Sequence, residues 1–172
     1  MKTSLLTFCF WCLIALTVQS QPQEPVMDQT VWQSLQTDLQ EVGDETSVAI
    51  KFYYGITGVD RCCEFDREKD LDKLWSIIKF LQDRPKAKIE IGSHTDCRGA
   101  KRSNLASSRR NLRSLKEELK TVCDSIDQTE LLKRVAFRGY GESRPLEECE
   151  CGDCSSEQHA RNNRLSIRLL KM

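Results

Sequence analysis

The pattern of apolar and polar residues along the chain predicts four strands and two long helices. Apolar side chains alternate with polar ones in four short segments, as expected of strands that bury one face. These segments are 48–52, 87–91, 135–137 and 165–169. Two longer segments, 67–83 and 105–122, carry apolar residues at the spacing of one buried helix face. The resulting β-α-β-α-β-β order favours an α/β (α+β) sandwich, in which a mixed sheet carries the helices on one face.

A shorter amphipathic segment precedes this pattern. Asp28 is suited to cap a short helix that ends before Gly43-Asp44. Its apolar positions recur at helical spacing and are Val31, Leu35, Leu39 and Val42. We expect this helix to pack against its own domain, and docking on another chain is the alternative.

The remaining connections are predicted from residues that interrupt the apolar pattern. We expect irregular loops at 55–63 and 121–128, a helical turn at 129–132 and a cysteine-rich loop at 147–157.

The first twenty residues have the pattern of a secretory signal peptide. Lys2 precedes an apolar run from Leu5 to Val18, which is shorter than the ~18–20 residues of a membrane-spanning helix. We expect cleavage after Ser20, an exported chain and no membrane span in the mature protein. The predicted organisation is a signal peptide at 1–20, a linker with the short helix at 21–46 and one domain at 47–172.

The charge balance argues against binding to nucleic acid. The chain has 26 Lys and Arg residues and 26 Asp and Glu residues, without the basic excess of a nucleic-acid binder. The segment from Arg98 to Arg113 is locally basic and contains no acidic residue. It is interpreted as a solvated helix face, and a patch for an anionic ligand is the alternative.

Seven of the nine cysteines follow residue 20, so at least one is free or bonded to another chain. Cys149, Cys151, Cys154 and His159 have the spacing C-x-C-x2-C-x4-H, which is compatible with a tetrahedral zinc site. Export favours disulfides over zinc. We therefore expect disulfides, no metal and no cofactor.

The segment from Ser93 to Gly99 is the strongest candidate for a ligand site. It follows a strand and precedes a helix, so its polar groups gather where backbone amides are unpaired. A hydrolase is the alternative suggested by Ser93, His94 and Asp96. Adjacent strand residues point to opposite faces, so this order does not by itself build a nucleophile–base relay, and we expect no enzymatic activity.

Four motifs in the order and spacing found here resemble the OmpA-like peptidoglycan-binding domain family, over about 48–170. They are Gly-Ser-His-Thr-Asp-x-Arg-Gly at 92–99, Asn104 eight residues after Asp96, Gly-Tyr-Gly-Glu-Ser-x-Pro at 139–145, and Asn162-x-Arg164. The resemblance implies a non-catalytic periplasmic or outer-membrane-associated module that recognises the diaminopimelate residue of the peptidoglycan stem peptide. It also implies a cell-envelope role, with a further envelope protein as a possible partner.

The resemblance assigns roles to individual residues. Asp96 matches the acidic contact to the ligand ammonium, and Gly99 with neighbouring amides matches the backbone that binds its carboxylate. Asn104 matches a position that fixes the loop and contacts the ligand, and Arg164 matches the second Arg of an Asn-Arg-Arg motif. The full predicted set is Thr95, Asp96, Gly99, Asn104, Asn111, Asn162 and Arg164. The resemblance further implies a disulfide between Cys149 and Cys154.

One position departs from the family. An Arg that clamps the ligand carboxylate stands fifteen residues after the motif Asp in the family, and this chain has Asn111 there. Asn offers a hydrogen bond but no charge and no bidentate fork. The alternative to peptidoglycan binding is therefore an interaction or structural protein of the same fold with a degenerate pocket.

Overall fold

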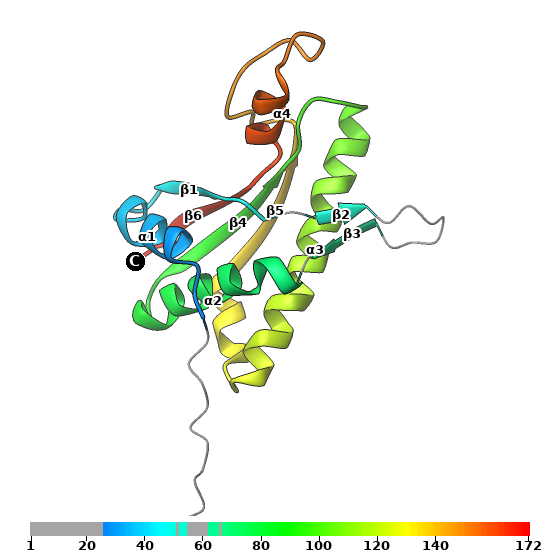
Figure 1. Ribbon diagram of the computed structural model, residues 1–172. Helices are drawn as coiled ribbons and strands as arrows, with labels where there is room; N and C mark the ends of the chain where they lie inside the picture. The colour runs from blue at the N-terminus through cyan, green and yellow to red at the C-terminus, as the bar shows by residue number, and fades with distance from the viewer. Residues whose placement is uncertain (1–25, 51, 55–61, 66) are drawn as a thin grey trace, which may run out of the picture.

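The computed structural model describes residues 26–50, 52–54, 62–65 and 67–172, and its centre is a four-stranded mixed sheet (Figure 1). The strand order is β1 (Glu45–Val48), β6 (Leu165–Lys171), β4 (Lys88–His94) and β5 (Val135–Gly141). β4 and β5 are parallel, whereas β6 is antiparallel to both of its neighbours. The predicted fold class is confirmed.

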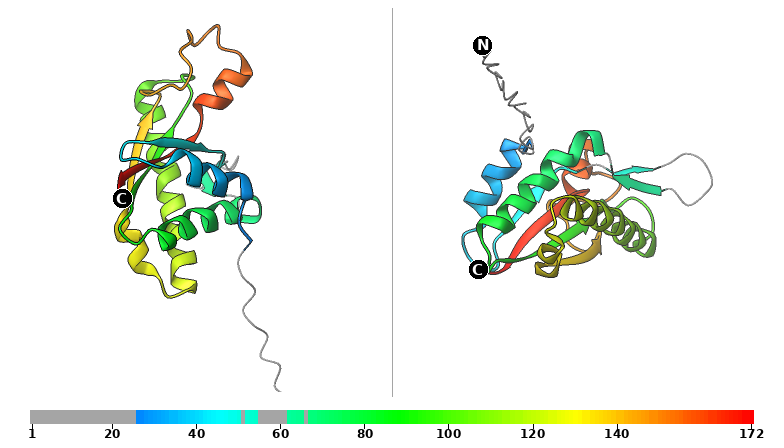
Figure 2. Two further views of the ribbon diagram at one scale, coloured as in Figure 1. Left: turned by 90° about the vertical axis from the view of Figure 1, so that its left-hand side faces the viewer. Right: turned by 90° about the horizontal axis from the view of Figure 1, so that it is seen from below.

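Three helices cover one face of this sheet, as the turned views show (Figure 2). They are α1 (Gln29–Asp38), α2 (Arg67–Asp83) and α3 (Lys101–Ser125). The core between helices and sheet is apolar, and its fully buried members include Phe80, Ile89, Leu115 and Leu165. Within the described residues, no helix is long and apolar enough to span a membrane.

The helix α1 packs onto its own domain. The Asp28 carboxylate accepts a hydrogen bond from the Val31 amide at 3.0 Å, so the predicted cap is confirmed. Leu35 and Leu39 are fully buried in the core. The prediction was wrong for Val42, which is 63% exposed because the helix ends at Asp38.

The first predicted strand was misplaced. β1 ends at Val48, and the Ile50 amide donates to the Val48 carbonyl at 3.1 Å, which turns the chain out of the sheet. The next residues form a separate two-stranded sheet of β2 (Phe52–Tyr54) and β3 (Cys62–Phe65) beside α3. Cys62 and Cys63 are therefore in a strand and not in the expected loop, whose residues 55–61 lie outside the described part.

Other boundaries also differ from the prediction. β4 continues to His94 because its last residues pair with β5 and β6. α3 continues to Ser125, since Val122 and Cys123 extend its buried face beyond the predicted break. The predicted turn lies within a 3₁₀ helix, η1 (Thr129–Arg134).

The cysteine-rich loop ends in a helix that the sequence did not predict. This helix, α4 (Ser156–Asn162), has only seven residues, too few for a clear apolar period. It begins with a capping box in which Ser155 and Gln158 exchange side chain-to-backbone hydrogen bonds. The capping box was the available sequence signal.

Candidate functional site

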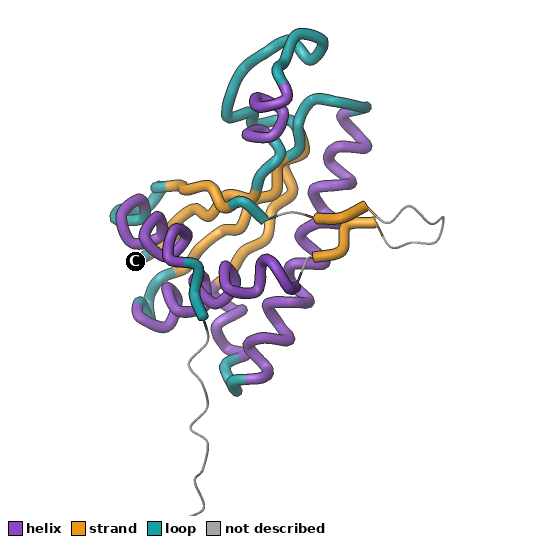
Figure 3. The backbone as a smooth tube through the Cα atoms, viewed as in Figure 1, coloured by secondary structure: helices purple, strands orange, loops and turns teal. Residues whose placement is uncertain are grey.

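The sheet topology brings the sequence motifs to one edge. Because β4 and β5 are parallel, their carboxyl ends meet, and the antiparallel β6 begins at the same edge (Figure 3). The Thr95 amide donates to the Gly141 carbonyl at 2.9 Å, and the His94 amide donates to the Arg164 carbonyl at 2.9 Å. Motifs up to seventy residues apart in sequence therefore adjoin.

The carboxylate of Asp96 is buried and already paired. It accepts hydrogen bonds from the Arg98 amide at 2.9 Å and from the Arg98 guanidinium at 3.1 and 2.7 Å. Burial opposes ionisation, but the Arg98 hydrogen bonds outweigh it, so the pKa of Asp96 lies below its usual value. Asp96 is thus a carboxylate at neutral pH, and Arg98 balances its charge. The sequence analysis missed Arg98 as its partner, although the Asp-x-Arg spacing was a signal.

Asn104 holds the loop after β4 against the start of α3. Its Nδ2 donates to the Asp96 carbonyl at 3.2 Å and also to the Glu142 carboxylate, which follows β5. Gly99 lies in this loop with φ +100°, a backbone conformation that favours glycine. The predicted loop-fixing role of Asn104 fits these contacts.

Asn162 and Arg164 lie on the other side of the site. The side-chain Oδ1 of Asn162 accepts from the amides of Leu146 and Glu147 at 2.8 and 3.0 Å, so this side chain anchors the cysteine-rich loop. Arg164 is half-buried and donates to the Arg144 carbonyl at 3.3 Å. Burial lowers the pKa of Arg164.

Two predicted site residues have buried polar atoms without a hydrogen-bond partner. These atoms are Thr95 Oγ1 and Asn111 Oδ1. Thr95 adjoins Asp96, whereas Asn111 lies about 10 Å further along α3 than Asn104, at the helix rise of ~1.5 Å per residue. Asn111, Ser108 and Asn104 share one buried helix face.

Two disulfides close the loops around this edge. The predicted Cys149–Cys154 disulfide is confirmed, and a second one joins Cys97 to Cys151 across 54 residues. Sequence spacing could not reveal the second pair, because only the fold brings Cys97 to this loop. Among the cysteines whose side chains are described, Cys123 is free and buried.

A buried polar network lies beneath the site. His94 stacks on Tyr140 with ring centroids 4.9 Å apart, and His94 Nε2 lies 3.0 Å from the Ser166 hydroxyl. The Tyr140 hydroxyl donates to the Glu90 carboxylate. Burial, together with the positive charge of Arg164, lowers the pKa of His94 to about 4. His94 is therefore neutral at physiological pH.

The locally basic segment of α3 lines an open groove of about 600 Å³ beside β5. Its lining includes two apolar residues, Leu112 and Phe137, and four cations, which are Arg109, Arg113, Lys116 and Arg138. The groove keeps the anionic-ligand alternative open for this helix face.

Replacing Asn111 by Leu is expected to raise the free energy of unfolding by about 1 kcal/mol, because the exchange removes a buried acceptor that lacks a partner. Asn104→Leu is the matched control on the same helix face. It should lower stability, since it removes hydrogen bonds to Asp96 and Glu142. Urea unfolding measures both. Equal losses in the two variants would contradict the account of Asn111.

The comparisons with known proteins concern the fold. Neither a family model nor the sequence of a curated protein matches this chain. The C-terminal domain of Helicobacter pylori MotB is similar in structure, with a TM-score of 0.50 and 19% identity over 71% of this chain and 84% of that chain. The periplasmic domain of the same MotB gives 0.51 and 16% over 76% and 77%. The OmpA-like domain of FopA1 from Francisella tularensis gives 0.45 and 12% over 78% and 87%.

The MotB domains share the fold of this chain, but at 19% and 16% identity they do not tell which ligand this chain binds. The chain therefore has the fold of these MotB domains, a mixed sheet with its covering helices, and it carries the four sequence motifs at one edge of that sheet.

Proposed function

We propose that this chain is a non-catalytic peptidoglycan-binding module of the cell envelope that recognises the diaminopimelate residue of the stem peptide. The observation that carries the proposal is the convergence of all four motifs at one sheet edge. Thr95 bonds to Gly141, His94 bonds to Arg164, and Asn104 bonds to Asp96 and Glu142. Charges of both signs lie at this edge, on Asp96 and Arg164.

This edge suits a zwitterionic ligand. Asp96 offers a buried carboxylate to an ammonium, while the amides near Gly99 and the guanidinium of Arg164 offer donors to a carboxylate. Arg98 is paired with Asp96, and its side chain is 66% exposed, whereas that of Asp96 is 10% exposed. A ligand ammonium that binds Asp96 has to replace the hydrogen bonds from the Arg98 guanidinium, which can then turn into solvent.

The geometry favours binding over hydrolysis. Ser93 is 1% exposed, in a strand paired on both sides, so its hydroxyl is out of reach of a substrate. His94 faces Ser166 and not Ser93, and its low pKa makes it a poor base. This support for a non-enzymatic role comes from the same residues that suggested a hydrolase.

The proposed location is the periplasm, in association with the outer membrane. It rests on the predicted signal peptide at 1–20, which lies outside the described residues. In this proposal, either the peptidoglycan itself or a further envelope protein attaches the chain to the envelope.

Asp96→Asn is expected to weaken binding to purified peptidoglycan sacculi about tenfold or more, because a hydrogen bond to a charged group contributes ~1.5–3 kcal/mol. Asn keeps the size of the side chain, removes the charge and replaces one acceptor oxygen by an NH₂ donor. Asp124→Asn, at an exposed position of α3, is the matched control and should bind like the wild type. The readout is co-sedimentation with sacculi, with free diaminopimelate as competitor. Equal binding by Asp96→Asn and the wild type would place the ligand elsewhere.

The second candidate is an interaction or structural protein with a degenerate pocket. The observation that favours it is the Arg98 guanidinium bound to Asp96, together with Asn111 at the family's Arg position. Arg98→Ala frees the carboxylate of Asp96. If both the wild type and Arg98→Ala stay in the supernatant with sacculi, the degenerate-pocket alternative holds.

A further inference from the structure

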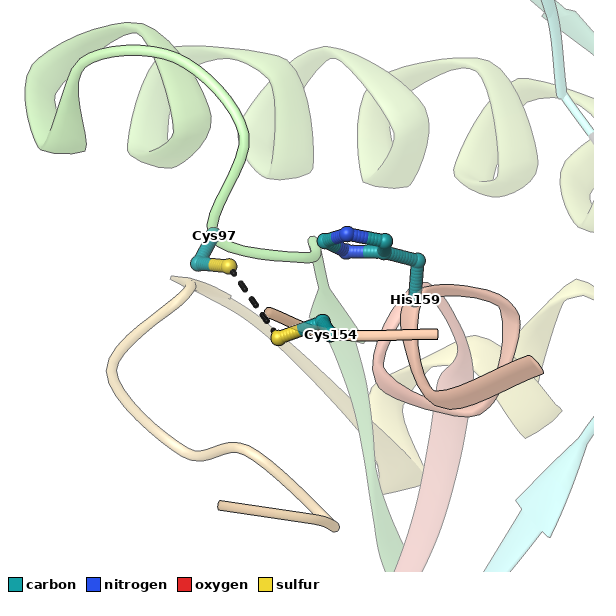
Figure 4. Close-up of side chains that lie close together, drawn as sticks. All are labelled: Cys97, Cys154 and His159. Atoms are coloured by element: carbon teal, nitrogen blue, oxygen red, sulfur yellow. Dashed lines mark hydrogen bonds between the residues drawn. The ribbon is translucent and has the colours of Figure 1, made fainter. Parts of the chain in front are cut away.

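The loop after β4, the cysteine-rich loop and α4 bring four cysteine sulfurs and the imidazole of His159 close together. Cys97 and Cys154 belong to different disulfides, yet their Sγ atoms are 3.9 Å apart. A ring nitrogen of His159 and these two sulfurs all lie within 4.8 Å of one another. Figure 4 shows the imidazole extending from α4 toward both sulfurs. The remaining two cysteines, Cys149 and Cys151, are bonded to this pair.

We propose that reduction of the two disulfides converts this cluster into a zinc site. Its ligands are Cys97, Cys154 and His159, and either Cys149 or Cys151 completes the tetrahedron. The inference is independent of peptidoglycan binding.

The spacing of the sulfurs fits this geometry. Zinc–sulfur bonds of about 2.3 Å in a tetrahedron place two thiolates about 3.8 Å apart. Cys97 and Cys154 lie at 3.9 Å before any movement. The two sulfurs therefore need only small adjustments, and the larger shift falls on His159 and on the fourth cysteine.

The state of His159 is a second, independent observation. The residue is 8% exposed, and its Nδ1 is buried without a hydrogen-bond partner. Buried imidazole nitrogens are ordinarily bonded, so this group is available for a ligand. The Asp96 carboxylate, which is paired with Arg98, lies 3.9 Å from Nδ1.

The chemistry balances with a dithiol as reductant. A dithiol transfers two electrons and two protons to each disulfide, which becomes two thiols while the dithiol becomes a cyclic disulfide. Zn²⁺ then displaces the protons of the ligating thiols. Cys151 is exposed, so a reductant reaches the Cys97–Cys151 bond from solvent. A cyclic disulfide, which takes up two electrons and two protons and becomes a dithiol, re-forms each protein disulfide by the reverse exchange, and the ion is released.

The zinc site would preserve a link that the disulfide makes in the oxidised chain. The Cys97–Cys151 bond ties the loop after β4 to the cysteine-rich loop. A zinc ion held by Cys97, Cys154 and His159 ties the same two segments together. We infer that the chain keeps this connection in both redox states.

The test compares the full chain before and after reduction. A phosphine reduces the disulfides, with water supplying the protons and becoming the oxygen of the phosphine oxide, and it leaves no competing thiol. After incubation with ZnCl₂ and removal of free ion, elemental analysis should find one Zn²⁺ per reduced chain and none per oxidised chain. Co²⁺ in place of Zn²⁺ should give the visible absorption of a tetrahedral thiolate site.

Variants locate the ion. Cys97→Ser and His159→Gln should each weaken zinc binding tenfold or more in competition with a chromophoric chelator. The double variant Cys62→Ser/Cys63→Ser changes cysteines outside the cluster and should bind like the wild type. The proposal is overturned if the reduced chain binds no zinc, or if Cys97→Ser and His159→Gln bind it as tightly as the wild type.

Discussion

Gly141→Ala is expected to lower the free energy of unfolding by about 3 kcal/mol or more, the range of severe single substitutions. Gly141 ends β5 at the candidate site and has φ +56°. A Cβ there would lie 2.8 Å from the Leu105 amide nitrogen and 3.0 Å from the Leu105 Cα, both in the backbone of α3. Helix backbone cannot rotate away as a side chain can, so α3 and β5 would have to separate.

Substitutions at two other glycines separate the cost of the positive φ from the cost of the steric clash. Gly43 has φ +106° and open space around it, so Gly43→Ala measures backbone strain alone, about 1–2 kcal/mol. Gly152 has open space and no positive φ, so Gly152→Ala should be nearly neutral. Urea unfolding of the three variants gives the comparison. If Gly141→Ala lowered the free energy of unfolding no more than Gly43→Ala, the close approach of α3 to β5 would not contribute to the loss of stability.

The sequence predicted the elements whose apolar residues are periodic. α2 and α3 each carry one apolar stripe, and apolar residues alternate with polar ones in β4 and β6, although both strands are buried on both faces over most of their length. The first strand failed this test because its alternation continues past the turn at Ile50 into a different sheet. Periodicity alone cannot show that the chain has left one sheet and entered another. α4 was missed because seven residues give too few turns for a period.

The candidate site was predictable where it follows one segment of chain. The loop from Thr95 to Gly99 and its neighbour Asn104 form one local unit, fixed by strand end, glycine and helix start. What the sequence could not give were partners that only the fold brings together. Cys97 meets Cys151 only when β4 and the cysteine-rich loop are in place.

The second large effect is a loss of stability as the pH falls from about 6.5 to about 4. Burial, with the charge of Arg164, lowers the pKa of His94 from the ordinary 6.5 to about 4. Between these pH values His94 is protonated in the unfolded chain and neutral in the folded chain. Stability therefore falls with decreasing pH in this window and is unaffected by His94 above it. At ~1.36 kcal/mol per pKa unit, the loss reaches about 3 kcal/mol near pH 4.

His94→Gln removes this titration and keeps an amide that can bond the Ser166 hydroxyl. The variant should be less stable than the wild type at pH 7, because it loses the stack on Tyr140, but its stability should change less between pH 6.5 and 4.5. Urea unfolding at several pH values measures both slopes, and the His94 ring resonance should not titrate between pH 7.5 and 5.5. A resonance that titrates near 6.5, or equal slopes in the two proteins, would show that His94 takes up its proton without unfolding the chain. In that case the ring would have solvent access, and the network of His94, Tyr140 and Glu90 would not be shielded from solvent beneath the site.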